Sequence, residues 1–233
     1  MRKYFIIPAR GGSKGIKNKN QRTVSKYSLV EWSIIHSLFL SGKKDHIIVS
    51  SDNQNILNIA KKYNIDAQKR PDNLSGDKVF TEPVMSHALS RYDIKDDDIV
   101  ILIQPTSPLR KKQTLISALN AVEHENFDSS LTVKEVHQFK WTAGGNYIGN
   151  PVYQERPRRQ DMKPEFIENG SVYMTRYNNF LKSNNRISGK TKLIISDPNE
   201  SIDVDNLTDL KITRILSKPF VKEWDGFIKN IQT

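Results

Sequence analysis

The stretch IIPARGGSKGIKNKN, Ile6 to Asn20, joins an apolar run directly to a loop with three glycines and four cations. The residues KYFIIPA, 3–9, form a continuous β-rich run, which predicts a buried strand that ends where the glycines begin. After the loop, LVEWSIIHSLFL, 29–40, carries apolar residues at helical spacing. A strand, a glycine-rich loop and a helix in this order predict the first unit of a sheet covered by helices.

The same alternation repeats further along the chain. HIIVSSD, 46–52, predicts a second strand, with Asp52 placed to cap the helix that follows. DIVILIQP, 98–105, predicts a third buried strand, and TLISALNAVEHE, 114–125, supplies the next helix. Continuous apolar strands separated by helices are typical of a parallel sheet with both faces covered. The sequence therefore predicts an α/β fold with a doubly wound, mostly parallel, Rossmann-like sheet.

A β-rich segment interrupts this alternation. SSLTVKEVHQFKWTAGGNYIGNPVYQ, 129–154, has strand-like runs broken by GGN and GNP, which favours hairpins over another strand–helix unit. We therefore expect one domain over residues 1–233, with a small lobe inserted at about 134–168. The last helix, near 206–218, is predicted to bury an apolar stripe made of Leu207, Leu210 and Ile215.

Composition limits the class of protein. The chain has 233 residues, 36% of them hydrophobic, and contains no cysteine, which excludes disulfides and thiolate zinc sites. It has no long apolar run and no signal-like segment before the first strand, so we expect a cytoplasmic protein without a membrane partner. The formal net charge of +10 suits an anionic partner but does not distinguish nucleic acid from a small anionic molecule.

The glycine-rich loop lies where a doubly wound sheet binds ligands, beyond the carboxyl ends of its strands. Glycines let the backbone approach an anion, and Arg10 and Lys19 can neutralise phosphate oxygens. The loop matches neither of the common phosphate-binding patterns, G-x-x-x-x-G-K-[ST] and G-x-G-x-x-G. It predicts a polyphosphate cradle, and the alternative is a basic loop that contacts only solvent.

Five stretches, taken in order, resemble one family. They are ARGGSKGIKNKN, KRPDNLSGD, QPTSPLR, RPRRQD with ENGSVYM, and SIDVD, and they span nearly the whole chain. The set resembles the CMP-sialic acid synthetases, or acylneuraminate cytidylyltransferases, and is especially similar to the catalytic domain of the animal enzymes. The resemblance implies that CTP reacts with a nine-carbon 2-keto acid sugar, such as N-acetylneuraminate, KDN or a legionaminate-like acid, to give the CMP-sugar and pyrophosphate.

Two alternatives stay open. One is a cytidylyltransferase for another acid, such as the eight-carbon acid Kdo or a phosphonate, although the Kdo enzymes carry a different first loop and lack QPTSPLR. The other is a basic nucleic-acid-binding protein, which would need aromatic stacking platforms or a basic recognition helix. Here the cations gather in loops and the aromatic residues largely follow core spacing, so no nucleic-acid partner is expected.

The resemblance also assigns residues to the site. It makes Arg10, Lys19 and Asp203 catalytic, with Lys19 nearest the reacting α-phosphate. The implied nucleotide-binding residues are Ala9, Arg10, Gly12, Ser13, Lys19, Asn20 and Arg70. The implied sugar-binding residues are Gln104, Thr106, Ser107, Lys140, Arg159, Phe166, Asn169 and Gly170. Thr81 is expected to replace one of the small hydroxyl residues that the family often carries in that region.

Asp203 and Asp205 are candidate metal ligands. Their i, i+2 spacing in an extended segment directs both carboxylates to one side. Mg²⁺ takes one or two carboxylates plus substrate phosphates, and the resemblance places the metal on this motif. The alternative is a capping and turn pair before the last helix, in which Asp205 is the cap.

The inserted lobe is expected to form a dimer. HQFKWTAGGNYIGNPVYQ, 137–154, is aromatic, strand-like and interrupted by turns, which suits an arm that packs on a partner. The resemblance implies a homodimer in which this lobe reaches into the neighbouring subunit's cleft. On that basis Lys140, and with it Arg159, would meet the sugar carboxylate across the interface, and the guanidinium fork of Arg159 would match a carboxylate well.

Overall fold

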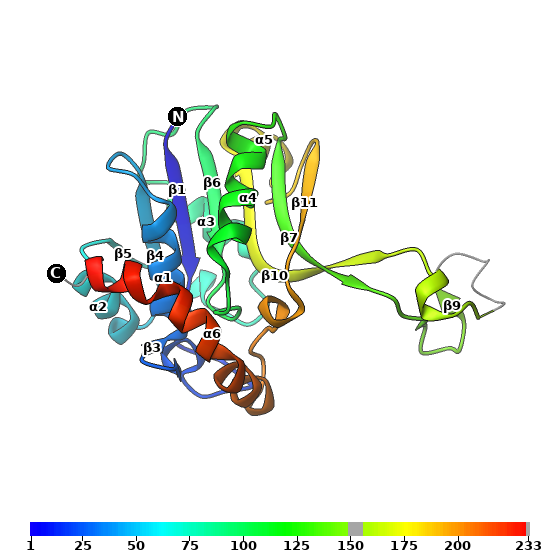
Figure 1. The fold of residues 1–233 in the computed structure, drawn as a ribbon. Helices are drawn as coiled ribbons and strands as arrows, with labels where there is room; N and C mark the ends of the chain where they lie inside the picture. The colour runs from blue at the N-terminus through cyan, green and yellow to red at the C-terminus, as the bar shows by residue number, and fades with distance from the viewer. Residues whose placement is uncertain (149–155, 232–233) are drawn as a thin grey trace.

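A seven-stranded mixed sheet forms the centre of the protein, with strand order β11-β7-β10-β6-β1-β4-β5 (Figure 1). The structure is a computed structural model and describes residues 1–148 and 156–231. The strands are β1 (Lys3–Pro8), β4 (His46–Ser51), β5 (Asp66–Lys69), β6 (Ile99–Ile103), β7 (Ser129–Val136), β10 (Glu165–Arg176) and β11 (Thr191–Ile195). Strands β5, β4, β1 and β6 are parallel, and β10 runs antiparallel to both β6 and β7.

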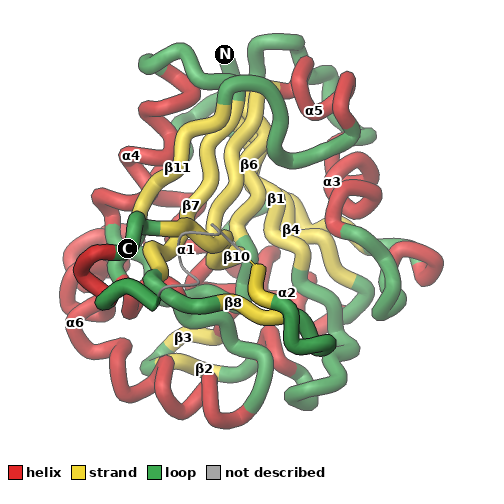
Figure 2. Tube along the Cα trace, turned by 90° about the vertical axis from the view of Figure 1, so that its right-hand side faces the viewer, coloured by secondary structure: helices red, strands yellow, loops and turns green. Residues whose placement is uncertain are grey.

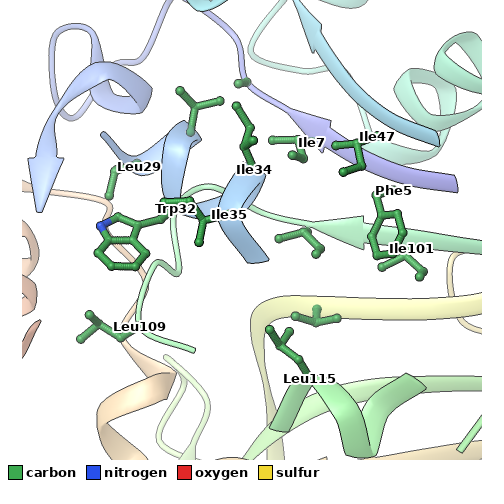
Figure 3. Close-up of a cluster of buried hydrophobic side chains, with 14 of the residues drawn as sticks. Phe5, Ile7, Leu29, Trp32, Ile34, Ile35, Ile47, Ile101, Leu109 and Leu115 are labelled. Carbon is green, nitrogen blue, oxygen red and sulfur yellow. The ribbon is translucent and has the colours of Figure 1, made fainter. Parts of the chain in front are cut away.

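Helices cover both faces of the sheet (Figure 2). One core packs α1 (Leu29–Leu40), α2 (Gln54–Lys62), α4 (Lys112–Glu123) and α6 (Leu207–Ile231) against residues such as Phe5, Ile7 and Ile101 (Figure 3). The other core packs α3 (Thr81–Leu89) and α5 (Tyr177–Ser183) against the alternate residues of the same strands. Since successive side chains of a strand point to opposite faces, the continuous apolar strands supply both cores, and the predicted doubly wound α/β fold is confirmed.

The order of the strands reverses direction at β1. From β1 the chain passes through α1 and β4 to β5 on one side, then returns through α3 to β6 on the other side. The loop after β1 leads through α1 toward β4, whereas the loop after β6 leads through α4 toward β7, so the two loops diverge at the carboxyl edge. A topological switch point of this kind opens a crevice between the loops.

Two local predictions were wrong. Asn53, not Asp52, caps α2, because its Oδ1 accepts hydrogen bonds from the backbone N–H groups of Asn55 and Ile56. Asp52 instead accepts a hydrogen bond from the N–H of Gly11, with Oδ1 and N 2.7 Å apart, and so fixes the first loop. Because Asn53 caps the helix, the Asp52 carboxylate is available for this contact with Gly11.

The predicted stripe of α6 was also wrong at two positions. Leu210 is buried, but Leu207 and Ile215 are 59% and 77% exposed. The buried face continues instead through Thr213, Ser217, Phe220, Trp224 and Ile228. Ile215 lies five residues after Leu210 and therefore falls on the opposite side of a helix with 3.6 residues per turn.

The strands β7 and β10 extend beyond the sheet into a projecting arm (Figure 1). The end of the arm holds β8 (Lys140–Trp141), paired antiparallel with β9 (Tyr147–Ile148), and the short helix η4 (Arg159–Asp161). Residues 149–154 of the predicted dimerisation segment lie outside the described residues. Across the described ranges, no helix combines the length and the apolar character that crossing a membrane requires.

Candidate functional site

A polar cleft of about 390 Å³ opens at the carboxyl edge of the sheet, at the switch point. The loops that follow β1, β5 and β6 line it, together with the segment before α6. It brings together eight residues predicted from the sequence: Arg10, Ser13, Lys19, Asn20, Arg70, Gln104, Thr106 and Asp205. Thr81, at the start of α3, also lines the cleft.

Buried contacts hold the first loop against its neighbours. Asn20 is 5% exposed, and its Nδ2 donates to the carbonyl oxygen of Arg10 across 2.9 Å. A Cβ at Gly15 would lie 2.1 Å from the carbonyl oxygen of Asp205, so only glycine permits this approach. Ala9 is buried and donates its N–H to Ser50. The loop is thereby fixed between β4 and the segment that carries the predicted metal ligands.

Three cations of the cleft, Arg10, Lys14 and Lys19, each pair with a carboxylate. Lys19 Nζ lies 3.1 Å from Asp205 Oδ1, and the Lys19 side chain is 15% exposed. On the other side of the cleft, Asp77 contacts two cations, with Oδ1 2.5 Å from an Nη of Arg10 and Oδ2 2.9 Å from Lys14 Nζ. Asp77 was not assigned a role from the sequence, because its contact with Arg10 spans 67 positions.

Arg70 is a buried cation at one wall of the cleft. It is 4% exposed, and its guanidinium donates to the hydroxyl and to the carbonyl oxygen of Ser50. The pKa of Arg70 is lowered to about 10, mainly by burial; the charge of Asp52 opposes this shift and the charge of Arg10 adds to it. Arg70 therefore remains charged at neutral pH and adds positive potential beside the first loop.

Asp203 and Asp205 lie together, and neither of their carboxylates caps α6. The cap is Asn206, whose Oδ1 accepts from the N–H groups of Thr208 and Asp209, so the capping alternative for Asp205 was wrong. Partial burial raises the pKa of Asp203, and the neighbouring Asp205 and Asp209 charges raise it further. A hydrogen bond from Thr106 and the charge of Lys19 act in the opposite direction.

These two carboxylates are the candidate ligands for a divalent cation. Asp203 is partly buried beside Asp205, and a cation bound there would stabilise the charged form of both carboxylates. Within residues 1–148 and 156–231, no group of three or more histidine, aspartate or glutamate side chains gathers as ligands. Mg²⁺ commonly completes its shell with phosphate oxygens and water, which is the donor set that a phosphate-binding cleft provides.

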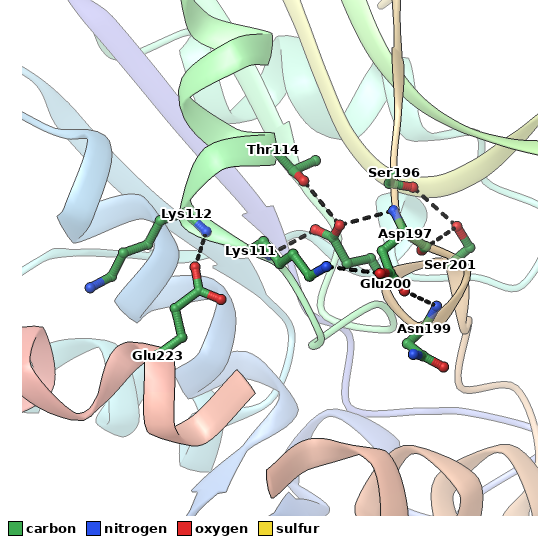
Figure 4. A network of polar contacts seen from close by, with 9 residues as sticks. All are labelled: Lys111, Lys112, Thr114, Ser196, Asp197, Asn199, Glu200, Ser201 and Glu223. Carbon is green, nitrogen blue, oxygen red and sulfur yellow. Dashed lines mark hydrogen bonds and ion pairs between the residues drawn. The ribbon is translucent and has the colours of Figure 1, made fainter. Parts of the chain in front are cut away.

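A polar network anchors the segment that leads to these carboxylates (Figure 4). Glu200 is buried and accepts from the backbone N–H of Lys111 and from the hydroxyl of Thr114, at the start of α4. Lys111 Nζ also lies 2.8 Å from Asp197 Oδ2. The backbone N–H of Val204 donates to the carbonyl oxygen of Thr106. The position of Asp203 is thus tied to the loop after β6.

Ser107 and Asn169 lie beneath the cleft instead of lining it. Ser107 is fully buried, and Asn169 is 6% exposed. The Asn169 amide accepts from Thr132 and donates to Ser196, over 2.7 and 2.8 Å. Gly170 has a φ of 69°, which favours glycine, and an added Cβ would lie 3.7 Å from Asp203 Oδ2. In this conformation these residues support the loops that line the cleft.

Arg110 is a buried residue whose role the sequence did not reveal. It is 1% exposed, and its guanidinium donates to Ser171, to the carbonyl oxygen of Gln104 and to Nδ1 of His36. Burial lowers the pKa of His36 well below its usual value, so the ring is neutral and can accept this hydrogen bond. The QPTSPLR string contained Arg110, but its contact with His36 spans 74 positions.

Three predicted sugar-binding residues lie on the arm. Lys140 is in β8, where its Nζ pairs with Glu165 across 2.7 Å. Arg159 is exposed in η4, and Phe166 is 39% exposed in β10. None of the three lines the cleft of its own chain as described, and Gly12 lines only a shallow hollow beside it.

Several known proteins are similar in sequence to this chain over most of its length. It is 31% identical to the flagellin modification protein B of Campylobacter coli, covering 91% of this chain and 93% of that protein. It is 29% identical to N-acylneuraminate cytidylyltransferase A of Danio rerio over 86% of this chain, but spans only 47% of that longer relative. A CMP-N,N'-diacetyllegionaminic acid synthase of Legionella pneumophila is 28% identical, covering 93% of this chain and 96% of that protein.

A solved structure shares the fold at low identity. A CMP:2-keto-3-deoxy-manno-octonic acid synthetase complexed with CTP superposes with a TM-score of 0.65 at 13% identity, covering 94% of this chain and 99% of that one. The cytidylyltransferase family model matches residues 4–187, which include β1, the glycine-rich loop and the loop after β6. On this match the chain is a member of the cytidylyltransferase family.

Proposed function

We propose that the protein transfers CMP from CTP to the anomeric hydroxyl of a nine-carbon 2-keto acid sugar and releases pyrophosphate. The observation that carries the proposal is the cleft that joins the cations of the first loop to Gln104, Thr106 and Asp205. Relatives named for acylneuraminate and for diacetyllegionaminic acid support the substrate class.

The residues of the cleft suit phosphoryl transfer. This reaction requires little covalent chemistry from the protein, so positioning and charge stabilisation supply most of the catalysis. Lys19 would stabilise charge at the α-phosphate that the sugar oxygen attacks, while Arg10 and Lys14 would hold the leaving pyrophosphate. Gln104 and Thr106 would orient the sugar. Asp203 and Asp205 would hold Mg²⁺, which when bound neutralises phosphate charge.

A substrate panel tests this function. The whole protein is incubated with CTP and Mg²⁺ and, in turn, with N-acetylneuraminate, KDN, a legionaminate and Kdo, and pyrophosphate release is measured. We expect release with a nine-carbon acid and much less with Kdo. Preferential release with Kdo would favour the eight-carbon alternative. Retention on DNA that CTP does not displace, without release from any acid, would favour nucleic-acid binding.

We further propose a homodimer in which Lys140, and with it Arg159, reaches the partner's cleft. Trp141 and Ile148 are 55% and 48% exposed on the arm, and such exposed apolar side chains suit an interface. Lys140→Ala and Lys19→Ala chains, each inactive alone, are mixed under subunit exchange. Half of the dimers are then heterodimers with one intact site each, so about a quarter of wild-type activity should return.

A second mixture provides the control. Arg10→Ala and Lys19→Ala affect two residues of the same chain's cleft, so each site of that heterodimer keeps one defect and no activity should return. If the Lys140→Ala mixture also stays inactive although mass spectrometry shows exchange, Lys140 acts within its own subunit or only stabilises the arm.

A further inference from the structure

We propose that Asp77 competes with the pyrophosphate end of the nucleotide for Arg10 and Lys14, and so sets how tightly the cleft holds CTP and released pyrophosphate. The inference rests on the proposed function, because it takes a polyphosphate as the ligand. It concerns a residue outside the site predicted from the sequence.

The contacts of Asp77 leave neither of its oxygens free. Oδ1 lies 2.5 Å from an Nη of Arg10, and Oδ2 lies 2.9 Å from Lys14 Nζ. Hydrogen bonds from these two cations lower the pKa of Asp77, so the carboxylate is ionised at neutral pH. Asp77 lines both the cleft and the hollow beside it, where Gly12 and Ser13 also lie. Its charge therefore lies among the groups that would bind phosphate.

The cations of the cleft form two groups, one on each side. Lys19 pairs with Asp205, on the side where Thr106 contacts Asp203. Arg10 and Lys14 pair with Asp77, on the segment between β5 and α3. In phosphoryl transfer the attacking and leaving oxygens lie roughly in line across the phosphorus. A sugar held near Thr106 would therefore direct the leaving pyrophosphate toward Arg10 and Lys14.

A phosphate oxygen and the Asp77 carboxylate need the same N–H groups. A ligand that contacts Arg10 and Lys14 must displace Asp77. Its apparent affinity is therefore its intrinsic affinity multiplied by the fraction of molecules in which the two cations are free. A monophosphate that contacts Lys19 alone avoids this competition. Asp77 would therefore weaken the binding of CTP and pyrophosphate but not of CMP, and it would promote release of the pyrophosphate product.

Direct binding measurements on the whole protein with Mg²⁺ test the inference. Isothermal titration calorimetry is carried out with CTP, inorganic pyrophosphate and CMP on the wild type, Asp77→Asn and Asp77→Ala. Exposed ion pairs are weak, so we expect the Kd for CTP and for pyrophosphate to fall about 2- to 5-fold in both variants. The Kd for CMP should stay unchanged.

Asp72→Asn is the matched control. Asp72 is exposed in the short helix η2 (Asp72–Leu74) of the same segment and does not line the cleft, so its loss removes equal charge without freeing Arg10 or Lys14. Unchanged or weaker binding of pyrophosphate by both Asp77 variants would overturn the inference. An equal gain in Asp72→Asn would also overturn it, since general electrostatics would then explain the effect.

The outcomes separate this inference from the proposed function. The titrations measure binding and do not need catalysis. A protein that binds CTP without transferring CMP would therefore contradict the proposed function, while the titrations would still test the Asp77 inference. A wild type that binds neither CTP nor pyrophosphate would contradict both. A wild type that is active and whose affinities the Asp77 substitutions do not change would contradict the Asp77 inference alone.

Discussion

Replacing Lys19 with alanine should lower turnover about 100- to 1000-fold, because such a loss is typical when a group that stabilises transition-state charge is removed. The ammonium group lies in the cleft, 3.1 Å from Asp205, and the short helix η1 (Lys19–Gln21) holds it there. The measurement is kcat from pyrophosphate release, together with the melting temperature.

Lys17→Ala is the control for this variant. Lys17 is an exposed cation of the same loop that does not line the cleft, and its backbone carbonyl, which accepts from Arg22, is retained. We expect near-wild-type turnover in Lys17→Ala. If Lys19→Ala is folded and turns over as fast as Lys17→Ala, Lys19 does not act on the reacting phosphate.

Replacing Asp203 with asparagine should raise the Mg²⁺ concentration needed for half-maximal activity by at least about 10- to 100-fold. Loss of a residue that only orients a metal ligand typically has an effect of this size, and Asp203 is proposed as a ligand itself. One hard anionic ligand is removed, while the asparagine oxygen can still accept the hydrogen bond from Thr106. Because a protonated carboxylate does not bind metal, the Mg²⁺ requirement of the wild type should rise as the pH falls through the raised pKa of Asp203.

The melting temperature of the Asp203→Asn variant distinguishes a metal ligand from a helix cap. The pKa of Asp203 is raised by folding, so the folded state binds its proton more tightly than the unfolded state does. The bound proton on Asp203 therefore stabilises the folded state at low pH, and this stabilisation is lost as the pH rises through the folded-state pKa. At neutral pH, Asp203→Asn should keep or raise the melting temperature.

Asn206→Ala provides the opposite pattern. It removes the cap of α6 and should lower the free energy of unfolding by about 1 kcal/mol while leaving the Mg²⁺ requirement unchanged. A lowered melting temperature and an unchanged Mg²⁺ requirement in Asp203→Asn would contradict its assignment as a ligand.

The sequence alone predicted the strands β1, β4 and β6 and the helix that follows each of them. Continuous apolar runs such as 3–9 and 98–105 predicted β1 and β6, because a strand buried on both faces needs apolar residues at every position. The helix predicted at 29–40 coincides with α1. The glycine-rich stretch lines one side of the cleft, as its place directly after a strand led us to expect, and its binding of phosphate stays a prediction.

Only the tertiary structure decided which polar side chains meet. Asp77 reaches Arg10, and Arg110 reaches His36, between segments 67 and 74 positions apart. A local pattern holds no information about such pairs, because they form only when the strand order brings separate loops to one edge of the sheet. The same limit explains α6, where Ile215 fitted an apolar pattern but faces solvent. Local sequence fixes the period of a helix, whereas packing against the sheet decides which of its faces is buried.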